Sequence, residues 1–275
     1  MKKALWTLTV DGYAPEITAL THPLLVHYAS KIGAEFRVIK ERRFPGYPPQ
    51  YEKLQIYELG RDYDWNIYVD SDALVHPDMF DPTDHLPKDT VCHNGSDMAG
   101  FRWTYDRFFR RDGRHIGSCN WFTAASDWCI DLWEPLRDLT LQQALDNITP
   151  LIYEQAPSLW RCEACKLERP TWDEATAENC GNCGKPGIAI PKRAIRAEDL
   201  LDDYTLSRNI AKYGLKFSTV AQIQERLRVG GCLWHVYTSS AEEKVRQMKQ
   251  VLHGWGLDNL MLYEYAGEIG DPATS

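Results

Sequence analysis

The sequence predicts an α/β protein in which a mainly parallel sheet is covered by helices on both faces. Apolar runs of strand length alternate with segments whose apolar residues recur at helical spacing, and glycines close the helical segments. This alternation favours parallel strands joined by right-handed crossovers, with ligands at the carboxyl ends of the strands. The expected elements are strand Leu5–Val10, helix Ile17–Ile32, strand Phe36–Ile39, helix Glu52–Leu59 and strand Asn66–Val69.

The second half of the chain follows this pattern less regularly. A proline-punctuated loop after residue 75 leads to strand Asn120–Ala124, helices Ser126–Leu136, Leu141–Glu154 and Glu198–Tyr213, strand Lys216–Val220 and helix Ser240–Leu252. Residues 160–191 are polar, rich in Gly and Cys, and lack an apolar period. We therefore expect a main domain formed by residues 1–159 and 192–275, with 160–191 as an insertion.

The composition is that of a folded globular protein. Of the 275 residues, 44% are hydrophobic and 25% charged, which argues against disorder. The net charge of −8 argues against wholesale coating of a nucleic acid or an anionic membrane. No apolar stretch reaches the roughly 18 residues of a membrane span, and Met1–Val10 lacks the pattern of a signal peptide. A cytoplasmic protein without a membrane span is the expectation.

The insertion carries four cysteines at a spacing typical of metal ligands. They form the paired motifs Cys162-x2-Cys165 and Cys180-x2-Cys183. Four thiolates can surround one tetrahedral Zn²⁺, and a segment without an apolar core has little reason to fold without the metal. The spacing predicts a zinc ribbon, which would serve as an architectural staple or as a platform for a partner or acceptor.

A pair of aspartates follows the third expected strand. Asp70 and Asp72 come directly after Asn66–Val69 and precede another apolar run. Two carboxylates that are separated by one residue at a strand end can face one hard cation, whose remaining ligands can come from a phosphate. The plain alternative is a polar turn, but the flanking apolar runs favour a metal site.

Asp70-Ser71-Asp72 resembles the Asp-x-Asp motif of the nucleotide-sugar-dependent glycosyltransferases of the GT-A fold, especially the glycogenin-like and related galactosyl- and xylosyltransferases. Thr7–Tyr13 is similar to the nucleotide-binding opening of that family, and Lys53 resembles the position that approaches the donor. The resemblance implies a GT-A sandwich and sugar transfer from a nucleotide-diphosphate donor, expected to be a UDP-sugar, to an acceptor hydroxyl. The donor-binding residues it implies are Leu8, Thr9, Asp11, Tyr13, Lys53, Asp70, Ser71 and Asp72.

A late histidine extends the resemblance. His235, in the run Leu233–Tyr237, looks like the third protein ligand of the family's cation. Imidazole beside two carboxylates suits Mn²⁺ better than Mg²⁺, so Mn²⁺ is expected and Mg²⁺ is the alternative. The alternative is that His235, which lies in an apolar run, is a core residue whose ring nitrogens have hydrogen-bond partners.

Clustered carboxylates open the expected helix Glu198–Tyr213, where the helix dipole stabilises anions. The stretch Asp202–Arg208 is similar to the acidic pair that carries the catalytic base in inverting GT-A families, with spacing one residue short at the arginine. Retaining, glycogenin-like families place an aspartate in an equivalent helix without that role. Asp203, and then Asp202, are therefore the catalytic candidates, and the stereochemistry stays open.

The acceptor is not fixed by these motifs. Phe101–His115 holds five Arg against two Asp among aromatic residues, a surface that could stack bases or sugar rings and hold phosphates. The acceptor is a glycan, a small molecule or a hydroxymethylated base in DNA. The competing class is a non-enzymatic nucleic-acid-binding protein that uses this segment and the zinc ribbon. A nucleotidyltransferase is a third hypothesis.

Overall fold

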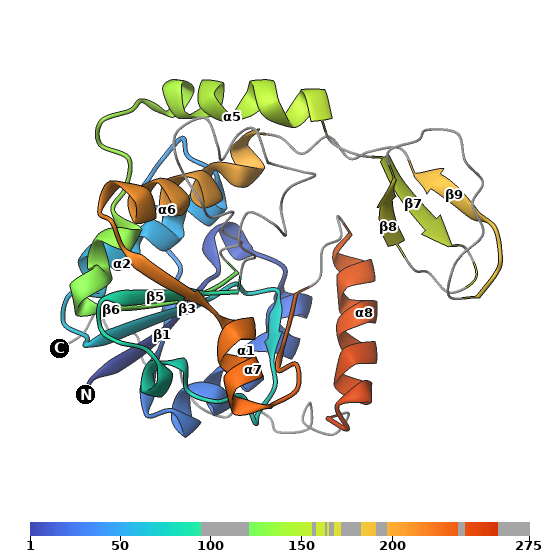
Figure 1. The fold of residues 1–275 in the computed structure, drawn as a ribbon, viewed down its shortest axis with the longest axis horizontal. Coiled ribbons are helices and arrows are strands. Elements are labelled where there is room, and N and C mark those ends of the chain that lie inside the picture. The colour runs from blue at the N-terminus through green and yellow to red at the C-terminus, as the bar shows by residue number, and fades with distance from the viewer. Residues whose placement is uncertain are drawn as a thin grey trace.

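The computed structural model describes residues 1–94, 121–155, 158–162, 164, 168–171, 183–190, 197–235 and 240–257 (Figure 1). Six strands form the central sheet in the order β10-β5-β6-β3-β1-β2. These strands are β1 (Lys3–Leu8), β2 (Ala34–Ile39), β3 (Trp65–Val69), β5 (Thr90–His93), β6 (Phe122–Ser126) and β10 (Lys216–Thr219). β6 pairs antiparallel with both β3 and β5, whereas the other neighbours in this sheet pair parallel.

Helices cover both faces of this sheet, as the sequence predicts. The α-helices are α1 (Pro15–Lys31), α2 (Ile56–Leu59), α5 (Leu141–Gln155), α6 (Leu201–Lys212), α7 (Val220–Leu227) and α8 (Ala241–Gly254). The 3-10 helices are η1 (Val10–Gly12), η2 (Pro49–Gln55), η3 (Pro82–His85), η4 (Asp127–Trp133) and η5 (Ala197–Leu200). The apolar clusters assign α1 and α7 to one face of the sheet, and η2, α2, η4, α5 and α6 to the other.

Alternation along the strands explains why both faces are apolar. Successive side chains of a strand point to opposite faces of the sheet. In β1, Leu5 packs in the cluster that contains α1, while its neighbours Ala4 and Trp6 pack in the cluster beneath α6. In β3, Ile67 packs in the cluster that contains α1, and Tyr68 packs in the cluster beneath α6. A sheet buried on both faces therefore has the continuous apolar runs that the sequence shows.

The central sheet and the helices on its two faces agree with the expected α/β sandwich, with differences in detail. The expected helix over 52–59 is a 3-10 helix followed by one short α-helix, and the expected helix over 126–136 is the 3-10 helix η4. β5, α7 and two further strands, β4 (Ala73–Val75) and β11 (Leu233–His235), were not predicted. β6 lies where a strand is expected but runs antiparallel. The strands among these elements are short, and their pairing partners are not adjacent in the chain.

The topology brings several chain segments to one edge of the sheet. β1, β3 and β5 run in the same direction, so their carboxyl ends lie at the same edge. Just beyond β3, the chain turns into β4, which leaves the central sheet and pairs antiparallel with β11. This pairing places His235 opposite Ala73, beside the Asp-x-Asp turn.

A second, three-stranded sheet forms in the part of the chain where the insertion is expected. β7 (Ser158–Cys162) lies between β8 (Glu168–Thr171) and β9 (Gly187–Ile190) and pairs antiparallel with both. In Figure 1 this sheet stands apart from the central one, beyond the end of α5. Within the ranges given above, no helix combines the length and apolar character needed to cross a membrane.

A buried histidine links the stability of the sheet to pH. His93 is 1% exposed, and neither ring nitrogen has a hydrogen-bond partner among the described residues. Burial lowers the pKa of His93 to about 4. The unfolded chain binds a proton at His93 more tightly than the folded chain does. The free energy of unfolding is therefore highest above pH ~6.5, and it falls by about 2–3 kcal/mol as the pH drops toward 4.

We therefore expect His93→Leu to lose less stability than the wild type between pH ~7 and ~4.5. Urea denaturation at several pH values measures this. His27→Leu is the control, because His27 is an exposed histidine of α1. An H93L slope equal to that of H27L would show that His93 does not set the acid sensitivity.

Candidate metal site at the sheet edge

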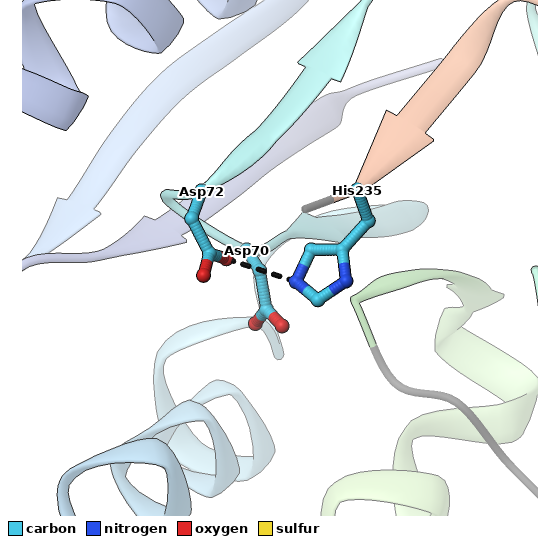
Figure 2. A group of neighbouring side chains, drawn as sticks. All are labelled: Asp70, Asp72 and His235. Carbon is cyan, nitrogen blue, oxygen red and sulfur yellow. Dashed lines mark hydrogen bonds and ion pairs between the residues drawn. The ribbon is translucent and has the colours of Figure 1, made fainter. Parts of the chain in front are cut away.

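Three side chains converge beyond the end of β3. Asp70, Asp72 and His235 each place one ligand atom so that all three atoms lie within 4.8 Å of one another. Figure 2 shows the three side chains directed toward a common space, the aspartates from the turn between β3 and β4 and the histidine from the end of β11. His235 Nε2 lies 3.1 Å from Asp72 Oδ1. The sequence-predicted trio is thus brought together.

Backbone contacts hold the Asp-x-Asp turn. The amide of Asp70 donates to the carbonyl of Trp121 at 2.8 Å, and the amide of Ala73 donates to the carbonyl of Asp70 at 3.1 Å. Thr21 of α1 donates its hydroxyl to the Ser71 carbonyl at 2.6 Å. The side chain of Ser71 contacts Thr7 Oγ1 at 3.2 Å. The turn is therefore tied to the neighbouring β1 and α1, so the carboxylates project from a fixed backbone.

Asp72 is a shielded carboxylate among hydrogen-bond donors. Its residue is 9% exposed. Besides His235, it contacts the ammonium of Lys244, from the first turn of α8, and accepts a hydrogen bond of 3.2 Å from the hydroxyl of Tyr13. Burial acts to raise the pKa of Asp72, but the hydrogen bonds and charges of His235 and Lys244 outweigh it and hold that pKa below its usual range. Asp72 is an anion in the folded protein.

Asp70 is linked to helix α6 through a buried lysine. The Lys53 ammonium lies 3.1 Å from Asp70 Oδ1 and 2.8 Å from Asp202 Oδ2, and its side chain is 1% exposed. Burial acts to lower the pKa of Lys53, but Asp202 and Asp70 outweigh it and raise the pKa above its usual value. Tyr68 donates its hydroxyl to Asp70 Oδ1 at 2.6 Å. Among the described residues, Lys53 and Tyr68 donate to the Asp70 carboxylate, and the Asp70 side chain is still 25% exposed.

The catalytic candidates on α6 have different surroundings. Asp202 is 5% exposed and pairs with Lys53. Asp203, the next residue in the first turn of α6, is only partly buried and also acts electrostatically on Lys53. Asp202 is therefore the more deeply buried of the two carboxylates, and both act on the charge of Lys53.

The expected donor-binding residues of the opening strand lie at the same edge. Leu8 ends β1, and its carbonyl accepts a hydrogen bond from the Ser71 hydroxyl. Thr9 donates its amide to the Ile39 carbonyl at 2.9 Å. Asp11 has a left-handed backbone (φ 57°) and accepts a 3.0 Å hydrogen bond from Arg42.

Tyr13, in the loop that follows β1, contacts the cluster of Asp70, Asp72 and His235 through Asp72. Its residue is 38% exposed while its hydroxyl contacts Asp72. Burial first, and then the charge of Asp72, raise the pKa of Tyr13, so the hydroxyl stays protonated and donates. The loop after β1 is therefore in direct contact with the Asp-x-Asp turn.

Three residues of the site were not predicted from the sequence. Lys244, Trp121 and Tyr68 contact the aspartates or the histidine through tertiary packing. Only Tyr68, next to the motif in sequence, has a local signal. The basic segment Phe101–His115 and the cysteines Cys165 and Cys180 lie outside the described residues.

The fold and the cluster together define an α/β sandwich with a candidate divalent-cation site at the carboxyl ends of its strands. No protein-family model and no curated protein matches the sequence.

Among solved structures, the chain is similar to a glycosyltransferase involved in the glycosylation of the major capsid of PBCV-1, with 12% identity, a TM-score of 0.43, and coverage of 90% of this chain and 99% of that one. It is similar to the galactosyltransferase LgtC in complex with donor and acceptor sugar analogs, with 11% identity, a TM-score of 0.44, and coverage of 93% and 100%. It is also similar to mouse xyloside xylosyltransferase 1, with 9% identity, a TM-score of 0.39, and coverage of 86% and 98%.

Proposed function

We propose that this protein is a metal-dependent glycosyltransferase that moves a sugar from a nucleotide-diphosphate sugar to an acceptor hydroxyl. The observation that carries the proposal is the convergence of Asp70, Asp72 and His235 within 4.8 Å at the carboxyl ends of parallel strands. Open α/β sheets bind their ligands at this edge. The resemblance of the Asp-x-Asp motif, noted from sequence, supplies the reaction class.

The donor set fits a divalent cation. Two carboxylates and one imidazole offer hard oxygen ligands and one nitrogen, a combination that suits Mn²⁺ and is accepted by Mg²⁺. Asp72 is an anion, and Asp70 retains exposed carboxylate surface. When bound, the cation would neutralise charge on the donor diphosphate as the sugar leaves.

The remaining groups of the site have roles that follow from their chemistry. Lys244 and Tyr13 are donors that contact Asp72, so they lie where a diphosphate beside that carboxylate would need partners. Lys53 holds Asp70 against α6 and keeps Asp202 paired. Asp203 is the candidate to face the acceptor. A UDP-sugar is the first donor to test.

The direct test is incubation of the protein and Mn²⁺ with a panel of nucleotide sugars, analysed by mass spectrometry. The acceptors are glycans, small-molecule alcohols and hydroxymethylated DNA. We expect one donor to be cleaved or its sugar transferred, with the activity lost in EDTA and restored by Mn²⁺. Activity that is unchanged in EDTA would contradict the metal role. DNA binding without cleavage of any donor would instead support the non-enzymatic alternative.

The insertion is proposed to bind a structural zinc. Cys162 ends β7 and Cys183 precedes the neighbouring β9, and their sulfur atoms lie 3.4 Å apart. That separation is too long for a disulfide of about 2.05 Å. It is near the about 3.8 Å expected for two thiolates on one tetrahedral Zn²⁺ with bonds of about 2.3 Å. Cys165 and Cys180 would complete the set, and such reduced thiols fit the proposed cytoplasmic location.

We expect the double variant Cys162→Ser, Cys183→Ser to lose one equivalent of zinc, measured by elemental analysis of the purified protein. The small β7–β9 sheet should become protease-sensitive, because a metal-folded segment loses its order with its metal. Mn²⁺ binding should not change. The control is Cys129→Ser, a buried cysteine of η4 in the main domain. An unchanged zinc content in the double variant would disprove the site.

A further inference from the structure

We propose that Trp121 is a positioning residue for the cation site, acting on two of its three ligands. The inference rests on the proposed function and adds to it a residue outside the ligand set. Trp121 immediately precedes β6, whose first residue, Phe122, pairs with Val69 at the end of β3. Trp121 therefore lies at the sheet edge where Asp70 follows.

The first contact is between aromatic rings. The indole of Trp121 stacks on the imidazole of His235, with centroids 5.3 Å apart and planes 10° from parallel. This separation falls in the range of offset stacking. His235 ends a strand of only three residues, so the strand alone gives its side chain little support.

The orientation of this ring decides whether His235 can bind a cation. A metal–nitrogen bond lies in the plane of the imidazole, so rotation of the ring moves Nε2 away from Asp72, from which it is now 3.1 Å distant. A flat indole across one face of the ring opposes that rotation. Trp121 therefore holds His235 in the orientation that faces the aspartates.

The second contact is through the backbone. The Trp121 carbonyl accepts the amide hydrogen of Asp70 at 2.8 Å. One residue thus fixes the ring of His235 with its side chain and the backbone of Asp70 with its carbonyl. Side-chain substitution removes the first contact and leaves the second, so the contribution of the ring can be measured separately.

The test measures Mn²⁺ affinity by electron paramagnetic resonance of the free ion. Trp121→Leu keeps an apolar side chain but has no ring to stack, and we expect it to bind Mn²⁺ about tenfold more weakly than the wild type. Trp121→Phe keeps a ring and should bind within about threefold of the wild type. The matched control is Trp128→Leu, since Trp128 is 68% exposed on η4.

A second readout reports proximity and does not depend on the stability of W121L. Bound Mn²⁺ is paramagnetic and quenches nearby indole fluorescence. W121F should lose a clear part of this quenching, whereas Trp128→Phe should not. Trp128 follows the far end of the five-residue strand β6, which puts it about 15–20 Å from Trp121.

The outcomes separate this inference from the proposed function. W121L binding Mn²⁺ as tightly as the wild type, or W121F leaving the quenching unchanged, would overturn the role of Trp121 while the metal site stands. A wild-type protein that binds no Mn²⁺ would overturn the proposed function and this inference with it. Weak binding in W121L, recovered in W121F, would support both.

Discussion

On the function proposed above, replacing Asp72 with asparagine is expected to lower sugar transfer about a thousandfold or more. The amide keeps the shape of the side chain but removes the charge that holds a cation, and the lost stabilisation of a developing diphosphate charge is worth several kcal/mol. The change also leaves Lys244 and His235 beside a neutral group. Mn²⁺ affinity should fall together with turnover, since both depend on the same carboxylate.

The measurements are turnover of the active donor and Mn²⁺ binding for Asp72→Asn, with Asp78→Asn as the matched control. The Asp78 side chain is 91% exposed, and its Oδ2 lies 3.9 Å from Nδ1 of His76. D78N should behave as the wild type in both measurements. If D72N kept activity within a few-fold of D78N, Asp72 would not be a ligand of the reacting complex.

Replacing Lys53 with methionine is expected to destabilise the protein by about 3–5 kcal/mol. The ammonium is the buried partner of both Asp70 and Asp202, and removal of one member of a buried ion pair leaves uncompensated charge. For a chain of this size the melting temperature should fall by roughly 5–10 °C. Methionine keeps most of the side-chain volume, so the loss reports charge rather than packing.

Two further variants separate charge from other causes. Lys53→Met with Asp202→Asn should recover part of the stability, because the second change removes a carboxylate that the first leaves unpaired. Lys216→Met is the matched control, since the Lys216 side chain is 70% exposed and pairs with Asp89 on the surface. A K53M melting temperature equal to that of K216M would contradict the bridging role of Lys53.

The parts of the fold predicted from sequence are those whose signal is local. α1 has apolar residues at helical spacing over many turns, and β3 is a buried run between polar ends. β4 and β11 have three residues each, and they exist because they pair with each other across more than half the chain. No local sequence pattern predicts such a pair of strands. The antiparallel direction of β6 is likewise a tertiary property.

The same division applies to the site. Asp70 and Asp72 follow from the strand and turn that carry them, and His235 from the resemblance of its segment to a late family ligand. Lys53 was expected at the donor, but the sequence did not indicate that its ammonium would lie buried between Asp70 and Asp202. Lys244 and Trp121 come from distant segments and reach the cluster only through packing.

In the proposed function, Asp70, Asp72 and His235 together hold one divalent cation. Crystals grown with Mn²⁺ and a nucleotide sugar, measured at the manganese absorption edge, test it most directly. We expect one anomalous peak within about 2.5 Å of ligand atoms from all three residues, with diphosphate oxygens beside it. Clear density for the nucleotide sugar with no anomalous peak among these side chains would contradict it.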